Sequence, residues 1–256
     1  MRALSFLLLS CSASDPLTLP PPPPSVAIPT ATASAAVLSA CPADMLEIDG
    51  EFCALLDQTC KKRRQPWQCA EFEAPSRCRG AVSTLRVCID RYEYPNRAGE
   101  LPKVMVSWNE AKAACAAIDK RLCTDSEWTL ACEGRERLPF PYGYARDPAV
   151  CSIDKPSPRP NDKRLFSPQT QADELARLDK REPSGSRARC VSAFGVHDLT
   201  GNVDEWVTNE SGRPYKSALK GGSWGEYRNA CRPATRAHDE AFRYYQIGFR
   251  CCRDVR

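Results

Sequence analysis

Histidine is almost absent from this chain, which contains only His197 and His238 among its 256 residues. A metal site made of three histidines is therefore excluded within the chain, whereas an iron site of two histidines and one carboxylate remains arithmetically possible. Paired CxxC motifs with zinc-finger spacing are missing as well, although the chain has 15 cysteines. The cysteines therefore predict disulfides rather than zinc ligands.

An excess of one charge is also missing. The chain has 36 lysines and arginines against 32 aspartates and glutamates, a formal net charge of +4 with the two signs interspersed. No basic face indicates nucleic acid as a partner, and the one basic run, Lys61-Lys62-Arg63-Arg64, is interpreted as a solvated loop rather than a phosphate site. Without its N-terminal segments, the chain fits one large domain better than two.

Long apolar runs are missing too. Residues 1–11 contain a basic Arg2 and then a leucine-rich run that is too short to span a bilayer, which predicts an export signal. Leu8-Leu9-Ser10-Cys11 resembles a bacterial lipobox, which implies lipidation of Cys11 and a membrane anchor in the bacterial cell envelope, in the periplasm or at the outer membrane. A misassigned start site or a chance match is the alternative, because the apolar run is short for a signal.

Residues 12–40 are predicted to be a Pro/Ala-rich linker. Pro20 through Pro24 favour polyproline II, and the Ala/Thr/Ser-rich run after them has no apolar periodicity. The composition changes abruptly at Cys41, so residues 41–256 are expected to form the folded domain, with residues 41–88 as its Cys-rich N-terminal part.

Cysteine, in contrast, is abundant in this chain. Setting Cys11 aside leaves 15 − 1 = 14 cysteines, an even number that can close as seven bridges. Such usage is typical of an oxidising compartment outside the cytoplasm. Connectivity does not follow from spacing; the pair Cys151 and Cys190 is expected only because these residues flank a loop-rich, proline-rich segment.

Two capping boxes predict helices. Ser107 and Glu110 form the first, before apolar residues that share one helical face and include Ala111, Cys115 and Ile118. The second consists of Thr124 and Glu127, and Gly134 is expected to end its helix.

The segment Ala193–Trp206 combines a Gly-Asn turn with three carboxylates. Asp198 and Glu205 offer carboxylate oxygens, and a bend at Gly201 turns the carbonyls of Gly201 and Val203 inward. This is the oxygen set that Ca²⁺ takes. The alternative is an Asx-stabilised turn whose acids lie in water.

Five segments follow one another in a characteristic order: Arg121-Leu122-Cys123-Thr124-Asp125-Ser126-Glu127-Trp128, Phe194-Gly195-Val196-His197-Asp198, Gly201-Asn202-Val203-Asp204-Glu205-Trp206, Lys220-Gly221-Gly222-Ser223-Trp224 and Ile247-Gly248-Phe249-Arg250. Together they resemble the formylglycine-generating enzyme (sulfatase-modifying factor) family. The resemblance covers roughly Met45 to Cys252 and implies an α+β, divergent C-type-lectin-like fold with little regular secondary structure. It also implies a structural Ca²⁺ bound by Asp198, Gly201, Val203 and Glu205, and a disulfide between Cys132 and Cys251.

The catalytic pattern of that family is incomplete in this chain. In the resembled enzymes, two cysteines after Gly-Gly-Ser bind copper(I), and one of them holds the substrate cysteine that O₂ converts to formylglycine. Cys231 matches the second cysteine, but Glu226 stands where the first is expected. A carboxylate cannot exchange with a disulfide and is a poor copper(I) ligand, so copper is not expected. Cys231, Glu226 and Ser223 are therefore weak catalytic candidates, and Cys231 is either bridged, to Cys252 or another neighbour, or a lone reactive thiol.

We interpret the sequence as that of a non-catalytic or divergent member of the family that binds a peptide or another ligand. The alternative is an O₂-dependent oxidoreductase, which makes formylglycine or performs a related metal-dependent oxidation; a structural scaffold is a third hypothesis. Trp206 and Trp224 are expected in the core, whereas Tyr227, Tyr244 and Tyr245 are candidates for the rim of a groove.

Overall fold

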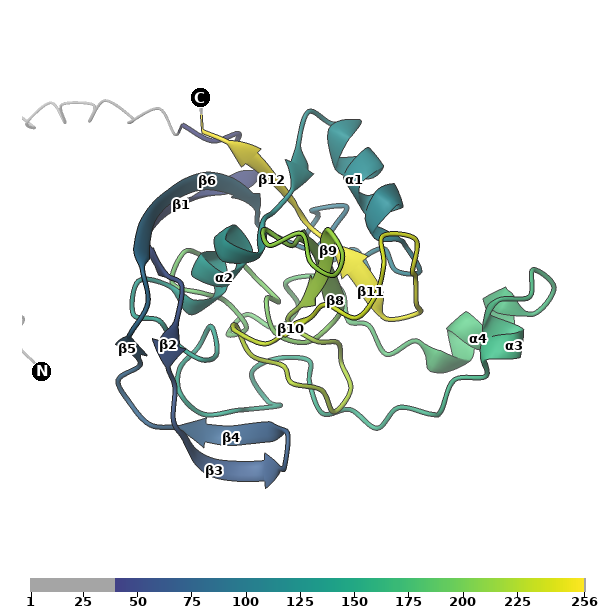
Figure 1. The fold of residues 1–256 in the computed structure, drawn as a ribbon. Coiled ribbons are helices and arrows are strands. Elements are labelled where there is room, and N and C mark those ends of the chain that lie inside the picture. The colour runs from purple at the N-terminus through teal and green to yellow at the C-terminus, as the bar shows by residue number, and fades with distance from the viewer. Residues whose placement is uncertain (1–39, 256) are drawn as a thin grey trace, which may run out of the picture. The chain divides into compact units, whose positions relative to one another are not determined.

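Two four-stranded sheets organise residues 40–255, the part of the chain that the computed structural model describes (Figure 1). The first sheet is antiparallel and has the order β1-β6-β12-β7. The chain's last strand thus lies inside this sheet, between β6 and β7. Its strands are β1 (Met45–Cys53), β6 (Val82–Asp90), β12 (Cys251–Asp254) and β7 (Arg121–Leu122).

The second sheet has the order β10-β9-β8-β11, in which β8 and β11 run parallel. Every residue of β9 is buried. Strand β9 ends at Lys220, because Gly221 and Gly222 take positive φ values of 87° and 69° and turn the chain. The strands are β10 (Ala234–Thr235), β9 (Ser217–Lys220), β8 (Asp204–Thr208) and β11 (Ile247–Phe249).

Two small ribbons come from the Cys-rich N-terminal part of the domain. One ribbon is the pair β2 (Leu56–Asp57) and β5 (Arg77–Cys78), which follows the paired ends of β1 and β6. The hairpin of β3 (Cys60–Gln65) and β4 (Gln68–Phe72) contains the basic run. The basic residues of β3 are exposed, as expected, but they form a strand that pairs with β4 and not the expected loop.

Both predicted helices form, each with its capping box. In α1 (Trp108–Ala116) the box is made by Ser107 and Glu110, and in α2 (Asp125–Glu133) by Thr124 and Glu127. Gly134 ends α2 with a φ of 65°. Ile118, expected on the buried face, is 47% exposed because α1 ends two residues earlier. The loop-rich segment that follows contains only α3 (Asp162–Leu165) and α4 (Gln171–Leu178).

The two neighbouring cysteines of β12 pack in two different hydrophobic clusters. Cys251 packs in a cluster with Trp108 and Cys115 of α1, whereas Cys252 belongs to a cluster with Trp128 and Cys132 of α2. The side chains of successive strand residues point to opposite faces of a sheet, so Cys251 and Cys252 cannot pack in the same cluster.

This alternation shows that the expected Cys132–Cys251 disulfide is wrong. Cys251 points toward α1 and is bridged to Cys115, while Cys252 on the other face is bridged to Cys123. Cys132 is bridged to Cys231 instead, with a Cα–Cα distance of 5.4 Å. Cys231 is thus a structural cysteine, and its partner is not Cys252.

Seven disulfides use all 14 cysteines of the described residues, and Cys151 is bridged to Cys190. This density is consistent with an extracytoplasmic location. No helix within residues 40–255 is long and apolar enough to cross a membrane. The expected signal with Cys11 and nearly all of the 12–40 linker lie outside the described residues. The remaining bridges are Cys41–Cys88, Cys53–Cys78 and Cys60–Cys69.

Peptide mapping without reduction tests this connectivity. We expect that digestion with trypsin and a glutamate-specific protease, which cleaves at Glu127 and so separates Cys123 from Cys132, releases the Cys132 peptide linked only to the Cys231 peptide. Mass spectrometry of the full chain gives the answer. A Cys132 peptide linked to the C-terminal peptide that carries Cys251 and Cys252, or an alkylated Cys231, would contradict the structure.

Candidate functional site

A buried ion pair joins two of the sequence motifs. The Glu205 carboxylate in β8 accepts hydrogen bonds from the Arg250 guanidinium, Nε to Oε2 and Nη2 to Oε1, both at 2.7 Å. Both side chains are 1% exposed. Trp128 Nε1 in α2 donates to the same carboxylate at 2.8 Å. Such a fork-to-fork pair fixes geometry as well as charge.

The other motifs meet the same centre. Arg250 Nη2 also donates to the carbonyl of His197 at 2.9 Å. Lys220 Nζ lies 5.5 Å from the Trp128 ring centroid and 3.0 Å from the Asp125 carboxylate. The segments that the sequence analysis singled out are therefore brought together around Glu205, Arg250 and Trp128.

The loop before β8 is a tight turn that requires glycine. Asp198, Gly201 and Asn202 take φ values of 60°, 88° and 55°. A Cβ atom on Gly201 would lie 2.3 Å from the carbonyl oxygen of Ser152, beside the disulfide of Cys151. The turn thus packs directly on the neighbouring loop, and only glycine permits that approach.

Three carboxylates gather beside this turn. Glu93 is completely buried, and burial, together with the charges of Asp198 and Glu205, raises its pKa well above the usual range. Burial and the Glu205 charge raise the pKa of Asp198 to about 6, although the backbone N–H of Gly185 donates to it. Arg250 is the cation that offsets these acids, so the cluster favours a further positive charge.

The expected Ca²⁺ ligands are only partly available. The carbonyls of Gly201 and Val203 accept no hydrogen bond from the described residues, and Glu93 Oε1 is buried without a partner. Both Glu205 oxygens, in contrast, already face Arg250. No group of three or more His, Cys, Asp or Glu side chains within residues 40–255 is arranged to hold a metal ion. A cation here would therefore depend on carbonyls as well as on carboxylates.

The three catalytic candidates lie in different surroundings. Cys231 is fully buried and bridged to Cys132. Ser223 is also fully buried, and its hydroxyl has no partner among the described residues. Glu226 is exposed, and its carboxylate lies 2.8 Å from Arg64 Nη2 in β3. Glu226 is thus ion-paired with the hairpin of β3 and β4, which is distant in sequence.

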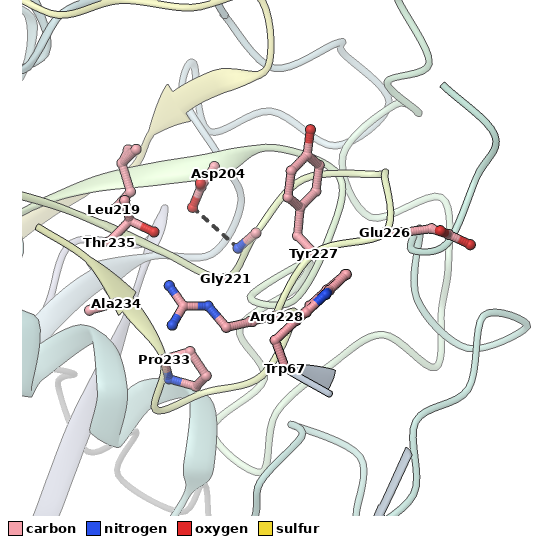
Figure 2. Close-up of a pocket in the computed structure, with 11 residues that line it drawn as sticks. Trp67, Asp204, Leu219, Gly221, Glu226, Tyr227, Arg228, Pro233, Ala234 and Thr235 are labelled. Atoms are coloured by element: carbon pink, nitrogen blue, oxygen red, sulfur yellow. Dashed lines mark hydrogen bonds between the residues drawn. The ribbon is translucent and has the colours of Figure 1, made fainter. Parts of the chain in front are cut away.

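That hairpin forms one wall of a pocket beside Gly221 and Gly222 (Figure 2). The pocket has a volume of about 350 Å³. Arg64 ties the hairpin to Asp154 at 2.7 Å as well as to Glu226, and Gln68 Nε2 donates to the carbonyl of Tyr227. These contacts place Trp67, at the hairpin's turn, against the pocket. The lining residues that matter below are Trp67, Asp204, Leu219, Tyr227, Arg228 and Pro233.

The pocket contains an acid and a base that are not paired with each other. Asp204 accepts a hydrogen bond from the backbone N–H of Gly222 at 3.2 Å, and burial raises its pKa to about 7. The charge of Arg228 lowers that pKa, so the guanidinium is near. Within residues 40–255, the Arg228 guanidinium has neither an ion pair nor a hydrogen bond.

A family model matches most of this chain. The model of the sulfatase-modifying factor enzyme 1-like domain matches residues 50–255. The chain belongs to this family. The α+β fold and the family inferred from the sequence motifs are thereby confirmed.

The relatives of this sulfatase-modifying-factor-like chain include one protein named as an inactive enzyme and one named as a formylglycine-generating enzyme. It is 31% identical over 173 residues to the inactive C-alpha-formylglycine-generating enzyme 2 of Bos taurus, covering 59% of this chain and 50% of that protein. It is 29% identical over 179 residues to the formylglycine-generating enzyme of Bos taurus, covering 60% and 44%. The chain thus spans about half the length of these curated relatives or less.

Two solved structures share the fold. PvdO from Pseudomonas aeruginosa matches with a TM-score of 0.51 and 20% identity, over 85% of this chain and 96% of PvdO. CarF matches with a TM-score of 0.53 and 16% identity, over 84% of this chain and 99% of CarF. At these identities the likeness concerns the fold alone.

Arg228 and Trp67 were not predicted as site residues, because their places in the pocket depend on contacts between distant segments. Glu93 ends the segment Val87–Glu93, which also resembles the family, but its burial beside Asp198 and Glu205 does not follow from the sequence. The expected core positions of Trp206 and Trp224 are confirmed, Tyr245 is buried and Tyr227 is exposed at the pocket. His197 stacks on Tyr92, and His238 stacks on Phe242.

The Glu205→Gln substitution tests the central ion pair. It keeps the shape of the side chain but removes the one carboxylate that is hydrogen-bonded to the buried Arg250 guanidinium. We therefore expect a loss of about 3–5 kcal/mol in the free energy of unfolding. Urea unfolding of the full chain measures it. Glu100→Gln, which removes the exposed pair with Arg97, is the control and should cost less than about 0.5 kcal/mol. Equal losses for the two variants would show that the buried pair does not hold the fold.

Proposed function

We propose that this protein is an extracytoplasmic, sulfatase-modifying-factor-like domain without oxidase chemistry, which binds a peptide or another small ligand. We further propose that a lipid on Cys11 anchors it in the bacterial cell envelope, on the strength of the Leu8-Leu9-Ser10-Cys11 motif. Incorporation of labelled fatty acid that is lost in Cys11→Ser tests the anchor. Nucleic acid is not a proposed partner, because acids and bases are interspersed along the chain.

One observation carries the loss of oxidase chemistry: every cysteine of the described residues is in a disulfide. Cys231, the only thiol that matches the family's copper pair, is bridged to Cys132 and fully buried. The other position is Glu226, which is engaged with Arg64. A bridged sulfur cannot form the mixed disulfide that would hold a substrate cysteine without first being reduced.

The pocket supports a binding role. Its volume of about 350 Å³ lies within the range of small-ligand sites, and it combines apolar walls with a few polar groups. The hairpin that closes one side is fixed by the Cys60–Cys69 disulfide and by the two ion pairs of Arg64. A wall held in place before binding reduces the entropy that a ligand must overcome.

Copper and turnover assays test the absence of oxidase chemistry. We expect the full chain, purified from an oxidising compartment, to bind no copper(I) in competition with a bathocuproine chelator. It should also consume no O₂ with a cysteine-containing sulfatase peptide. The physical reason is that no thiolate pair is available to hold either copper or the substrate.

The Glu226→Cys variant provides the matched control. Its new thiol lies at an exposed position, so it should react with a thiol reagent in the folded protein, whereas the wild-type domain should not. Copper-dependent O₂ consumption by the wild-type protein would refute the proposal and favour the alternative, an O₂-dependent oxidoreductase.

We also propose a structural Ca²⁺ at the turn before β8. The carbonyls of Gly201 and Val203, the Asp198 carboxylate and one oxygen of Glu205 would hold it, and its charge would stabilise loops. Support comes from the free carbonyls, from the buried Glu93 oxygen without a partner and from the excess of acids over bases in the cluster.

Calcium removal tests this site. We expect chelation to lower the melting temperature of the full chain and added Ca²⁺ to restore it, because the ion binds only the folded state. In Asp198→Asn, which keeps the shape and suits the positive φ, calorimetry should show an affinity for Ca²⁺ that is weaker by roughly tenfold, since one ligand charge is lost. A melting temperature that neither chelator nor Ca²⁺ changes would contradict the assignment.

A further inference from the structure

We propose that the pocket beside Gly221 and Gly222 selects small zwitterions, namely molecules of amino-acid size that carry both an ammonium group and a carboxylate. This inference rests on the proposed binding function and names the ligand's chemistry. The observation behind it is that opposite charges occupy one pocket without neutralising each other.

The acidic side of the pocket is Asp204. This residue begins β8, and the backbone N–H of Gly222 orients its carboxylate. Neither a lysine nor an arginine of the described residues forms an ion pair with it. A half-buried carboxylate that lacks a cation favours a ligand group that brings one.

The basic side is Arg228. Figure 2 shows its guanidinium and the Asp204 carboxylate extending into the same space, with Pro233 and Ala234 on one side and Trp67 and Tyr227 on the other. The remaining acid of the lining, Glu226, is already paired with Arg64. Arg228 is therefore free to bind a ligand carboxylate.

Apolar contacts complete the site. Trp67 is 50% exposed, the one strongly exposed tryptophan of the five in the chain, and it stands at the turn of the disulfide-closed hairpin. With Leu219 and Pro233, it offers a surface for an aromatic or aliphatic side chain. A ligand that carries only one charge would leave either Asp204 or Arg228 without a partner, so the pocket should discriminate against it.

Three probes of one shape separate the two charges. L-phenylalanine carries both, 2-phenylethylamine lacks the carboxylate, and 3-phenylpropionate lacks the ammonium group. We expect calorimetry with the full chain to show L-phenylalanine binding at least about tenfold more tightly than either analogue, as expected for one charged hydrogen bond.

Two variants assign the charges. Arg228→Gln should weaken L-phenylalanine and 3-phenylpropionate by about tenfold or more and leave 2-phenylethylamine unchanged. Asp204→Asn should weaken L-phenylalanine and 2-phenylethylamine and leave 3-phenylpropionate unchanged. Trp67→Ala should weaken all three probes, and an unchanged melting temperature would show that each variant is folded.

The proposal is overturned if L-phenylalanine binds no better than both analogues, if no probe binds at millimolar concentration, or if the two charge variants affect all probes alike. Those outcomes leave the absence of oxidase chemistry untouched, because copper binding and peptide turnover are measured separately. Turnover of a cysteine peptide, conversely, would refute the proposed function without bearing on the probe series.

Discussion

The buried pair of Glu205 and Arg250 is the interaction on which the domain depends. Glu205 lies in β8, Arg250 lies between β11 and β12, and Trp128 of α2 donates to the same carboxylate. With 1% of each charged side chain exposed, neither charge has water as an alternative partner. The two sheets and α2 are therefore held in one arrangement. The loop that precedes β8 is positioned by the same contacts.

Disulfides extend this arrangement outward in both directions from β12. Because the side chains of the strand alternate, Cys251 is bridged to Cys115 of α1, and Cys252 is bridged to Cys123, two residues before α2. Cys132, near the C-terminal end of α2, is bridged to Cys231. The bridge at Cys231 therefore follows from strand geometry and not from a need for chemistry. A thiol that matches a catalytic position in sequence is, in three dimensions, part of the core.

Local patterns predicted local structure, and distant contacts escaped prediction. Each capping box, at Ser107 and at Thr124, involves only four consecutive residues at the start of a helix. The sequence alone therefore predicted α1 and α2. The partner of Cys132 depends on which face of a strand each cysteine occupies, and spacing does not contain that information. In the sequence, Glu226 was notable only because it stands where the family's first cysteine is expected. In the structure, it is ion-paired with Arg64, 162 residues away.

The same residue connects the departure from the family's cysteine pattern with one wall of the pocket. A cysteine at position 226 would leave Arg64 with only Asp154, and the hairpin would lose one of the two ion pairs that hold it beside the Gly221-Gly222 turn. Trp67 reaches the pocket only because that hairpin is in place. Ion pairs at exposed positions contribute little to overall stability, so the effect of the Glu226 carboxylate is to orient the hairpin rather than to strengthen the fold. The carboxylate at position 226 and the position of the hairpin beside the pocket are therefore linked through Arg64.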